Sequence, residues 1–186
     1  MTGRGTKKIM LSLALIHWPC LDKNGREIAT AITNLDLHDL ARVSLTYGIN
    51  TLYIVHPNDA QLEFAQKIVD HWLKGYGGIY NPLRKRAFES IELVRDISDV
   101  KERTGARLVG TSARKGDGCM SWPEARELAK AADVCLVFGT GWGLAPRLME
   151  SLDGAIEPIE AGAGFNHLSV RSAVSIAVDR IVGRQT

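Results

Sequence analysis

Short apolar runs alternate along the chain with longer segments in which apolar residues recur at helical spacing. The strand-like runs cover residues 9–16, 51–55, 108–111, 134–138 and 156–159. The helical patterns cover residues 37–47, 59–73, 121–132 and 168–182. Nearly continuous apolar strands separated by helices are typical of a parallel sheet that is buried on both faces. The pattern therefore predicts a single α/β domain over residues 1–186, with a mostly parallel sheet flanked by helices.

Two segments fall outside this alternation. Residues 75–86 combine glycine, tyrosine, asparagine and proline, and we expect them to form a long loop. Residues 1–8 are polar and basic, and we expect a disordered tip before the first strand. The apolar run after this tip leads into Trp18 and Pro19 rather than into a small-residue cleavage site, which argues against a signal peptide.

The composition is that of an ordinary globular chain. Of the 186 residues, 45% are hydrophobic and 24% are charged, so a packed core is expected. The net charge of +2 does not by itself indicate nucleic-acid binding, which usually brings a stronger or more clustered basic bias. One local cluster, Arg84, Lys85 and Arg86, is either a solvated loop or helix start, or a contact for phosphate.

The cysteines and histidines indicate neither a disulfide framework nor a metal site. The chain has three cysteines at wide spacing, which fits reduced thiols and a cytoplasmic location. Cys135 lies in an apolar run and is most simply a small core residue. His17 and Cys20 form a lone pair of possible ligands, so no metal is expected. No stretch approaches the ~20 apolar residues of a membrane span, so no membrane partner is expected.

A glycine-rich turn, residues 139–144, follows the fourth apolar run. Backbone N–H groups at such a turn bind ligands in open α/β sheets. The spacing is G-x-G-x-G, and Leu144 stands where a dinucleotide fingerprint has its third glycine. No Lys-Ser or Lys-Thr follows, so a P-loop is excluded as well. On the glycines alone, a plain tight turn is the simpler interpretation.

The last predicted helix has an unusually small, apolar interior. Val170, Ala173, Val174, Ala177 and Val178 allow close approach of its backbone, either to a sheet or to a partner subunit. Ser169 or Asn166 is the expected cap of this helix.

Three segments in order resemble the motifs of the SPOUT (α/β-knot) superfamily of methyltransferases. Residues 42–49 resemble the first motif, in which an arginine begins a helix that runs to a glycine. Residues 136–144 resemble the second, a strand followed by a turn that ends in Gly-Leu. Residues 156–159 and 166–173 resemble the third, an Ile-Pro-Ile strand before a helix start. The chain is most similar to a small bacterial branch of RNA methyltransferases that is itself similar to the tRNA guanine-N1 methyltransferases.

The resemblance implies a fold, a cofactor and a partner. The fold would include a C-terminal trefoil knot, which periodicity cannot predict. The cofactor would be S-adenosyl-L-methionine, with S-adenosyl-L-homocysteine as product, and the enzyme would act as a homodimer on RNA. The implied cofactor-binding residues are Thr111, Ser112, Phe138, Gly139, Thr140, Gly141, Leu144, Ile156, Pro158, Ile159, Asn166, Leu168, Ser169 and Ser172.

The resemblance also implies catalytic and substrate-binding residues. The candidates for catalysis are Arg42, Asn166 and His167, and those for substrate binding are Asn34, His38, Arg114 and Arg171. Arginine is effectively always charged, so Arg42 would orient a phosphate or carboxylate before it acted as a base. Four of the candidates have a plainer alternative. His38 and Arg42 share a face that is simply solvated, Asn34 is a helix cap, and His167 bonds to the backbone at a helix start.

Two positions depart from the branch that methylates the ribose 2′-oxygen. Asp36 stands where that branch has an asparagine six residues before the first-motif arginine, and Ser169 stands where it has the third-motif asparagine. The choice between a base and a ribose oxygen as target therefore stays open. Trp18 and Trp142 are candidates to stack on a base, although a buried core tryptophan is commoner.

Two function classes fit the sequence. The first is transfer of a methyl group from S-adenosylmethionine to a nucleotide of tRNA or rRNA. The second is a non-catalytic nucleotide- or cofactor-binding regulatory module on the same fold, which the near-neutral charge favours. Because the dinucleotide fingerprint fails, a nicotinamide oxidoreductase is disfavoured.

Overall fold

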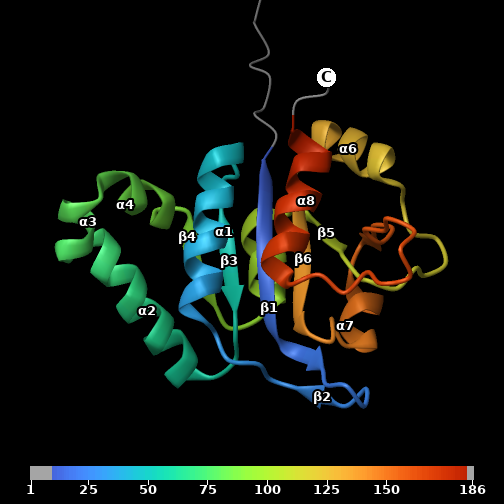
Figure 1. The fold of residues 1–186 in the computed structure, drawn as a ribbon, viewed down its shortest axis with the longest axis horizontal. Helices are drawn as coiled ribbons and strands as arrows, with labels where there is room; N and C mark the ends of the chain where they lie inside the picture. The colour runs from blue at the N-terminus through green and yellow to red at the C-terminus, as the bar shows by residue number, and fades with distance from the viewer. Residues whose placement is uncertain (1–9, 184–186) are drawn as a thin grey trace, which may run out of the picture.

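The computed structural model describes residues 10–183 and places a parallel sheet at the centre of the molecule (Figure 1). The expected disorder of residues 1–8 lies outside the described residues. Every neighbouring pair along the main path of the sheet is parallel. The strand order is β4 (Ile91–Val94), β3 (Leu52–Val55), β1 (Leu11–Leu21), β6 (Val134–Gly141), β5 (Arg107–Gly110) and β7 (Gly154–Ala155). β2 (Glu27–Ile28) pairs antiparallel with β1. The predicted α/β class with a mostly parallel sheet is confirmed.

Helices cover both faces of this sheet. One face packs against α1 (Asn34–Tyr47), α2 (Asp59–Leu73), α4 (Pro82–Phe88), α6 (Trp122–Ala131) and α8 (Val170–Val182). The other face packs against α5 (Ile97–Thr104) and α7 (Pro146–Ser151). A short helix, α3 (Tyr76–Tyr80), lies against α2 and α4 beyond the edge of the sheet (Figure 1). None of the helices described is long and apolar enough to cross a membrane.

Strand β1 shows why helices must cover both faces of the sheet. Side chains alternate between the two faces of a strand. Leu13 and Leu15 enter the core under α1 and α8, whereas Ala14 and Ile16 enter the core under α5 and α7. Cys135 on β6 is fully buried in the second core, as expected, and burial raises the pKa of its thiol to about 12.

Of two predicted helix caps, one is confirmed and the other is wrong. Ser169 caps α8, since its side chain accepts a hydrogen bond from the backbone N–H of Ser172. The suggestion that Asn34 caps the first helix is wrong. Thr33 is the N-cap, with its hydroxyl accepting from the N–H of Asp36, and Asn34 is the first helical residue. The small residues Val174, Ala177 and Val178 of α8 are buried against the sheet of the same chain.

The predicted loop over residues 75–86 is wrong, because α3 and α4 occupy it. Asn81 caps α4 and Pro82 starts it, a combination that favours a helix start. Both helices are too short to show a repeating apolar period. β4 and α5 are not predicted either, since Glu92 interrupts the apolar run of β4 and α5 spans only eight residues.

The predicted strand over residues 156–159 is also wrong. β7 ends at Ala155, and Ile156 makes only an isolated bridge to Met120. Pro158 has no N–H to donate to a sheet, so the chain leaves β7 at this point.

Candidate active site

Three loops converge on a cavity of about 490 Å³ at the carboxyl ends of β5 and β6. Residues 111–114 follow β5, residues 138–144 end β6 and form the glycine turn, and residues 166–171 lead into α8. Thr33 and Asp36, at the start of α1, line a fourth side. The volume lies in the range of small-molecule and cofactor sites. The cavity stands where open parallel sheets bind ligands.

The glycine turn is tightly built and tied to β1. A Cβ added to Gly139 would lie 2.6 Å from the backbone nitrogen of Leu144. Gly141 and Gly143 have φ of +59° and +104°, which favour glycine because they lie in the left-handed region. The N–H of Trp142 donates to the carbonyl of Leu21 at 2.9 Å. The turn therefore presents backbone to the cavity in a fixed position.

A hydrogen bond joins the loop before α8 to the loop after β5. The amide nitrogen Nδ2 of Asn166 donates to the carbonyl of Ala113 at 2.5 Å. Thr111, in turn, donates its hydroxyl to the carbonyl of Val137 at 3.0 Å. Asn166 thus holds two walls of the cavity together, and this contact gives it a positioning role.

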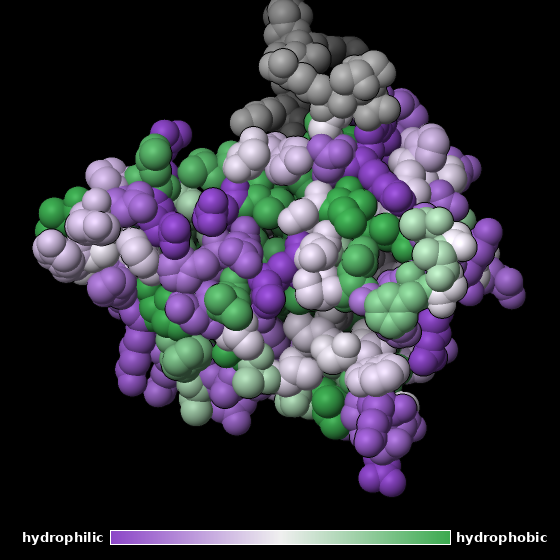
Figure 2. Space-filling model, viewed as in Figure 1, coloured by the Kyte–Doolittle hydropathy of each residue, from purple (hydrophilic) through white to green (hydrophobic). Residues whose placement is uncertain are grey.

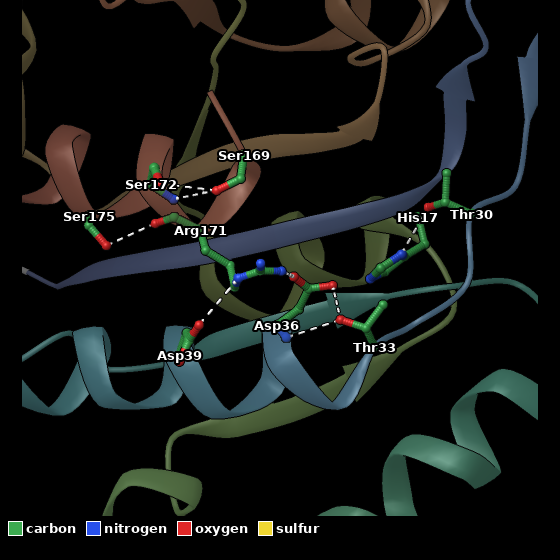
Figure 3. A network of polar contacts seen from close by, with 9 residues as sticks. All are labelled: His17, Thr30, Thr33, Asp36, Asp39, Ser169, Arg171, Ser172 and Ser175. Carbon is green, nitrogen blue, oxygen red and sulfur yellow. Dashed lines mark hydrogen bonds and ion pairs between the residues drawn. The ribbon is translucent and has the colours of Figure 1, made fainter. Parts of the chain in front are cut away.

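An ion pair between α1 and α8 closes the side of the cavity next to α1 (Figure 3). Arg171 Nη1 lies 2.9 Å from Asp36 Oδ1, and Arg171 Nε lies 3.2 Å from Asp39 Oδ2. The other Asp36 oxygen accepts from the Thr33 hydroxyl at 2.6 Å. The Asp36 side chain is 6% exposed and that of Arg171 is 32% exposed. Water screens this pair less than a surface pair. The ion pair therefore links the start of α1 to the start of α8 beside the cavity.

Aromatic rings stand beside the cavity. The rings of Trp142 and His167, both lining residues, have centroids 5.6 Å apart. Phe165 lies 5.7 Å from His167 and is 75% exposed. Trp142 is 52% exposed and is not a core residue, which leaves its ring accessible to a base. Trp18 instead lies under the guanidinium of Arg147.

Most of the predicted cofactor residues line the cavity. They are Thr111, Ser112, Phe138, Gly139, Thr140, Gly141, Leu144, Ile159, Asn166, Leu168 and Ser169. Three predicted residues do not. Ile156 is buried in the core, Pro158 is absent from the lining, and Ser172 lines a separate groove between α1 and α8.

The predicted catalytic and substrate residues divide between two places. Asn166, His167, Arg114 and Arg171 line the cavity. Arg42 lines the groove between α1 and α8, together with Val43, Tyr47, Ser172 and Ile176. Ser169 and Arg171 line both the cavity and the groove, so the two are contiguous.

Asn34 and His38 do not line the cavity. His38 Nε2 accepts from the indole of Trp72 at 3.1 Å, and its Nδ1 lies 2.5 Å from Arg84 Nη1. Burial, followed by the nearby charge of Arg84, lowers the pKa of His38. His38 therefore belongs to the packing between α1, α2 and α4.

Sequence reasoning missed Thr33 and Asp36 as lining residues. In the sequence Asp36 stands out only as a departure from a motif, since a single acidic residue in the first turn of a helix is ordinary. The signal that identifies it is its pairing with Arg171, 135 positions away, which no local pattern contains. Among the described residues, no group of three or more His, Cys, Asp or Glu is arranged to hold a metal ion.

A buried polar chain runs beneath the glycine turn. The hydroxyl of Thr140 donates to the carbonyl of Ile16 at 3.0 Å and lies 2.5 Å from the Thr30 hydroxyl. Thr30 in turn lies 3.0 Å from Nδ1 of His17, which is fully buried (Figure 3). Burial lowers the pKa of His17 to about 4, the carboxylate of Asp36 opposing the shift and His56 adding to it.

His17 is expected to make the fold sensitive to acid. The unfolded chain takes up its proton near pH 6.5, whereas the folded chain takes it up only near pH 4. Between these values the unfolded state binds more protons, so the free energy of unfolding falls as the pH falls from 6.5 to 4. The expected loss is about 3 kcal/mol. About 2 kcal/mol of this loss falls between pH 7 and pH 4.5, where urea unfolding measures it, and His17→Gln should flatten the dependence. An unchanged slope in His17→Gln would show that other groups carry the effect.

Comparison with known proteins gives concordant results. A family model described as SAM-dependent RNA methyltransferase matches residues 10–183. A protein of Oleidesulfovibrio alaskensis named tRNA (guanine-N(1)-)-methyltransferase is 40% identical over 182 residues, which cover 93% of this chain and 42% of that protein. An uncharacterized protein of Aquifex aeolicus is 41% identical over 183 residues, which cover 92% of this chain and 88% of that protein. The chain thus spans less than half the length of the first relative.

Solved structures share the fold at low identity. TrmJ from Z. mobilis aligns with a TM-score of 0.62 at 16% identity, over 95% of this chain and 69% of that chain. The SpoU methyltransferase AviRb from Streptomyces viridochromogenes, solved in complex with AdoMet, aligns with a TM-score of 0.56 at 14% identity, over 94% of this chain and 57% of that chain. At such identity these likenesses concern the fold.

Proposed function

Because the chain belongs to the family of SAM-dependent RNA methyltransferases, we propose that it transfers a methyl group from S-adenosyl-L-methionine to a nucleotide of RNA. The observation that carries this proposal is the convergence of three loops on one cavity at the carboxyl ends of β5 and β6. Two of these loops, residues 138–144 and 166–171, belong to the motifs of the resemblance. The proposed RNA is tRNA or rRNA.

The residues of the cavity fit this cofactor. Gly139, Gly141 and Gly143 line the cavity without side chains, so the backbone of the turn is available to a ligand there. Backbone donors and acceptors suit an adenine edge, and Phe138, Leu144 and Leu168 supply apolar walls. When bound, the cofactor supplies an electrophilic methyl group on a sulfonium. We propose one domain over residues 1–186, in which the segment before α8 closes the cavity as part of a trefoil knot.

The protein must orient the target nucleotide and receive its proton. The atom that gains the methyl group loses a proton, and S-adenosyl-L-homocysteine is the other product. Trp142 offers an exposed ring on which a base can stack. His167 lies next to that ring and is our candidate to receive the proton. Arg114 and Arg171 are candidates to bind phosphate, and Asn166 positions the loops.

We further propose that the chain acts as a homodimer, with the groove between α1 and α8 in the interface. The small residues of α8 are buried in the core of the same chain. Ser172, Ser175 and Ile176 line this groove instead. Arg42, in the groove, would then act near the junction of two subunits. Sedimentation at equilibrium should give twice the mass of one chain, and a monomer at micromolar concentration would exclude the proposal.

Methyl transfer is tested directly with bulk RNA. Purified protein, S-adenosylmethionine with a tritiated methyl group, and tRNA or rRNA that lacks the modification should give radioactive RNA. Nucleoside mass spectrometry should then identify one methylated nucleoside. His167→Ala should lower the rate and leave binding of S-adenosylhomocysteine unchanged, because His167 acts on the target. If the wild type binds S-adenosylhomocysteine but labels no RNA, the chain is the non-catalytic module instead.

A further inference from the structure

Helix α3 turns its glycines toward the protein and its large side chains toward solvent. A Cβ on Gly77 would lie 2.6 Å from Nε2 of His71, and a Cβ on Gly78 would lie 2.2 Å from the carbonyl oxygen of Trp72. The helix therefore sits directly on the end of α2, with no room for a larger residue on its inner face. This is the reverse of an ordinary surface helix, whose apolar face is buried.

Three exposed residues of α3 and one exposed residue at the start of α4 form the tyrosine patch, which we define as Tyr76, Ile79, Tyr80 and Leu83. Their exposed fractions are 70%, 76%, 76% and 68%. Tyr76 and Tyr80 lie one helical turn apart, and their rings stack with centroids 6.2 Å apart. Apolar side chains over α3 and α4 show as green at the left edge of Figure 2, beside purple polar ones. Single exposed apolar residues are ordinary, but four within one short segment mark an interaction site.

Lysines and arginines flank this patch along the chain. From His71 to Phe88 the chain has four basic residues and no acidic residue. Two of these cations are engaged, since Lys74 pairs with Asp70 at 3.0 Å and the Arg84 guanidinium lies 5.3 Å from the centroid of the Trp72 ring. Lys85 and Arg86 are exposed. A Cβ on Gly78 would lie 3.2 Å from Cδ of Lys85, so the stem of Lys85 lies beside the glycine face of α3.

We propose that the tyrosine patch, with Lys85 and Arg86, is a docking surface for a single-stranded segment of RNA. Bases would stack on Tyr76 and Tyr80, and phosphates would contact the two cations, as in other single-strand sites. The lack of acidic residues favours a polyanion over a protein partner. None of these residues lines the cavity, so the surface would hold RNA away from the methylated nucleotide. The inference rests on the proposed function, in which RNA is the substrate.

Fluorescence anisotropy with a labelled single-stranded RNA of mixed sequence, about twelve nucleotides long, tests the surface. The variant Tyr76→Ala with Tyr80→Ala should raise Kd about tenfold or more, because each base–aromatic stack is lost. The variant Lys85→Gln with Arg86→Gln should weaken the salt dependence of log Kd by about 1.4. Phe64→Ala with Lys67→Gln on α2 is the matched control, since Phe64 is also exposed, and it should bind as the wild type does.

Affinity for S-adenosylhomocysteine should be unchanged in all three variants, which shows that each is folded. Wild-type RNA affinity in both patch variants would overturn the proposal. So would a change in sedimentation without a change in RNA affinity, because the surface would then bind a second copy. If the wild type labels RNA while the patch variants bind it normally, the proposed function stands and the surface fails. If RNA binds through the patch but no methyl is transferred, the surface stands and the function fails.

Discussion

Replacing Gly139 with alanine is expected to raise the Kd for S-adenosylhomocysteine about a hundredfold, equivalent to about 2.7 kcal/mol. The new Cβ would lie 2.6 Å from the Leu144 nitrogen and 2.8 Å from the Gly143 carbonyl carbon. Both are backbone atoms, so no flexible side chain can move aside and the turn itself must shift. The turn lines the cavity, and its displacement would remove the backbone surface that the cofactor contacts. Isothermal titration calorimetry measures the change.

Gly116→Ala is the matched control for this experiment. Its Cβ would meet only the Sγ of Cys119, at 3.6 Å, an ordinary contact. We expect wild-type affinity in this variant. Thermal unfolding without ligand separates a folding defect from a binding defect in Gly139→Ala. A folded Gly139→Ala protein with wild-type affinity would show that the turn does not contact the cofactor.

Removal of the Asp36 carboxylate is expected to destabilise the fold by about 2 kcal/mol, because the partly buried Arg171 would keep only Asp39 as a partner and the Thr33 hydroxyl would lose its acceptor. Asp36→Ala should also lower the rate of methyl transfer, since α1 and α8 both border the cavity. Urea unfolding measures the first effect and tritium incorporation into RNA the second. The double variant Asp36→Ala with Arg171→Ala should be more stable than the sum of the single losses predicts, since neither charge is then left alone.

The surface pair between Arg147 and Glu27 is the control. Arg147 Nε lies 2.9 Å from Glu27 Oε1, but the two side chains are 58% and 34% exposed. Such a pair contributes about 0 to 1 kcal/mol, so Arg147→Ala should change stability little. If Asp36→Ala and Arg147→Ala lower the free energy of unfolding equally, the pair beside the cavity contributes no more to stability than a surface contact does.

The sequence predicted the cavity better than it predicted the local elements. The glycine turn and the segment before α8 were placed together by a resemblance of three motifs in order. Each motif alone is also compatible with an ordinary turn or helix start. In the structure these two segments meet at the rings of Trp142 and His167, whose centroids lie 5.6 Å apart, a contact that spacing along the chain does not show.

What the sequence could not predict depends on long-range contacts or on short elements. Asp36 lines the cavity and pairs there with Arg171, which comes from a distant helix. His38, predicted to bind substrate, instead hydrogen-bonds with Trp72 and lies beside Arg84. Both outcomes are set by helices that meet only in the folded chain. The two helices over residues 76–88 show no repeating period of apolar residues. Both are short, and in α3 the buried positions are the glycines Gly77 and Gly78. The glycine, asparagine and proline of residues 75–86 therefore indicate a loop where the structure has two short helices.

The contact between Asp36 and Arg171 has a further consequence for how the protein is made. It joins groups 135 positions apart, and β1 pairs with both β3 and β6 across most of the chain. Contacts between residues so distant in sequence form slowly, because a large loop must close before they are made. During synthesis, the central strand emerges long before the segment that completes the cavity. A nascent chain thus has no complete ligand site until α8 is in place, and cofactor binding would report that this part of the fold has formed.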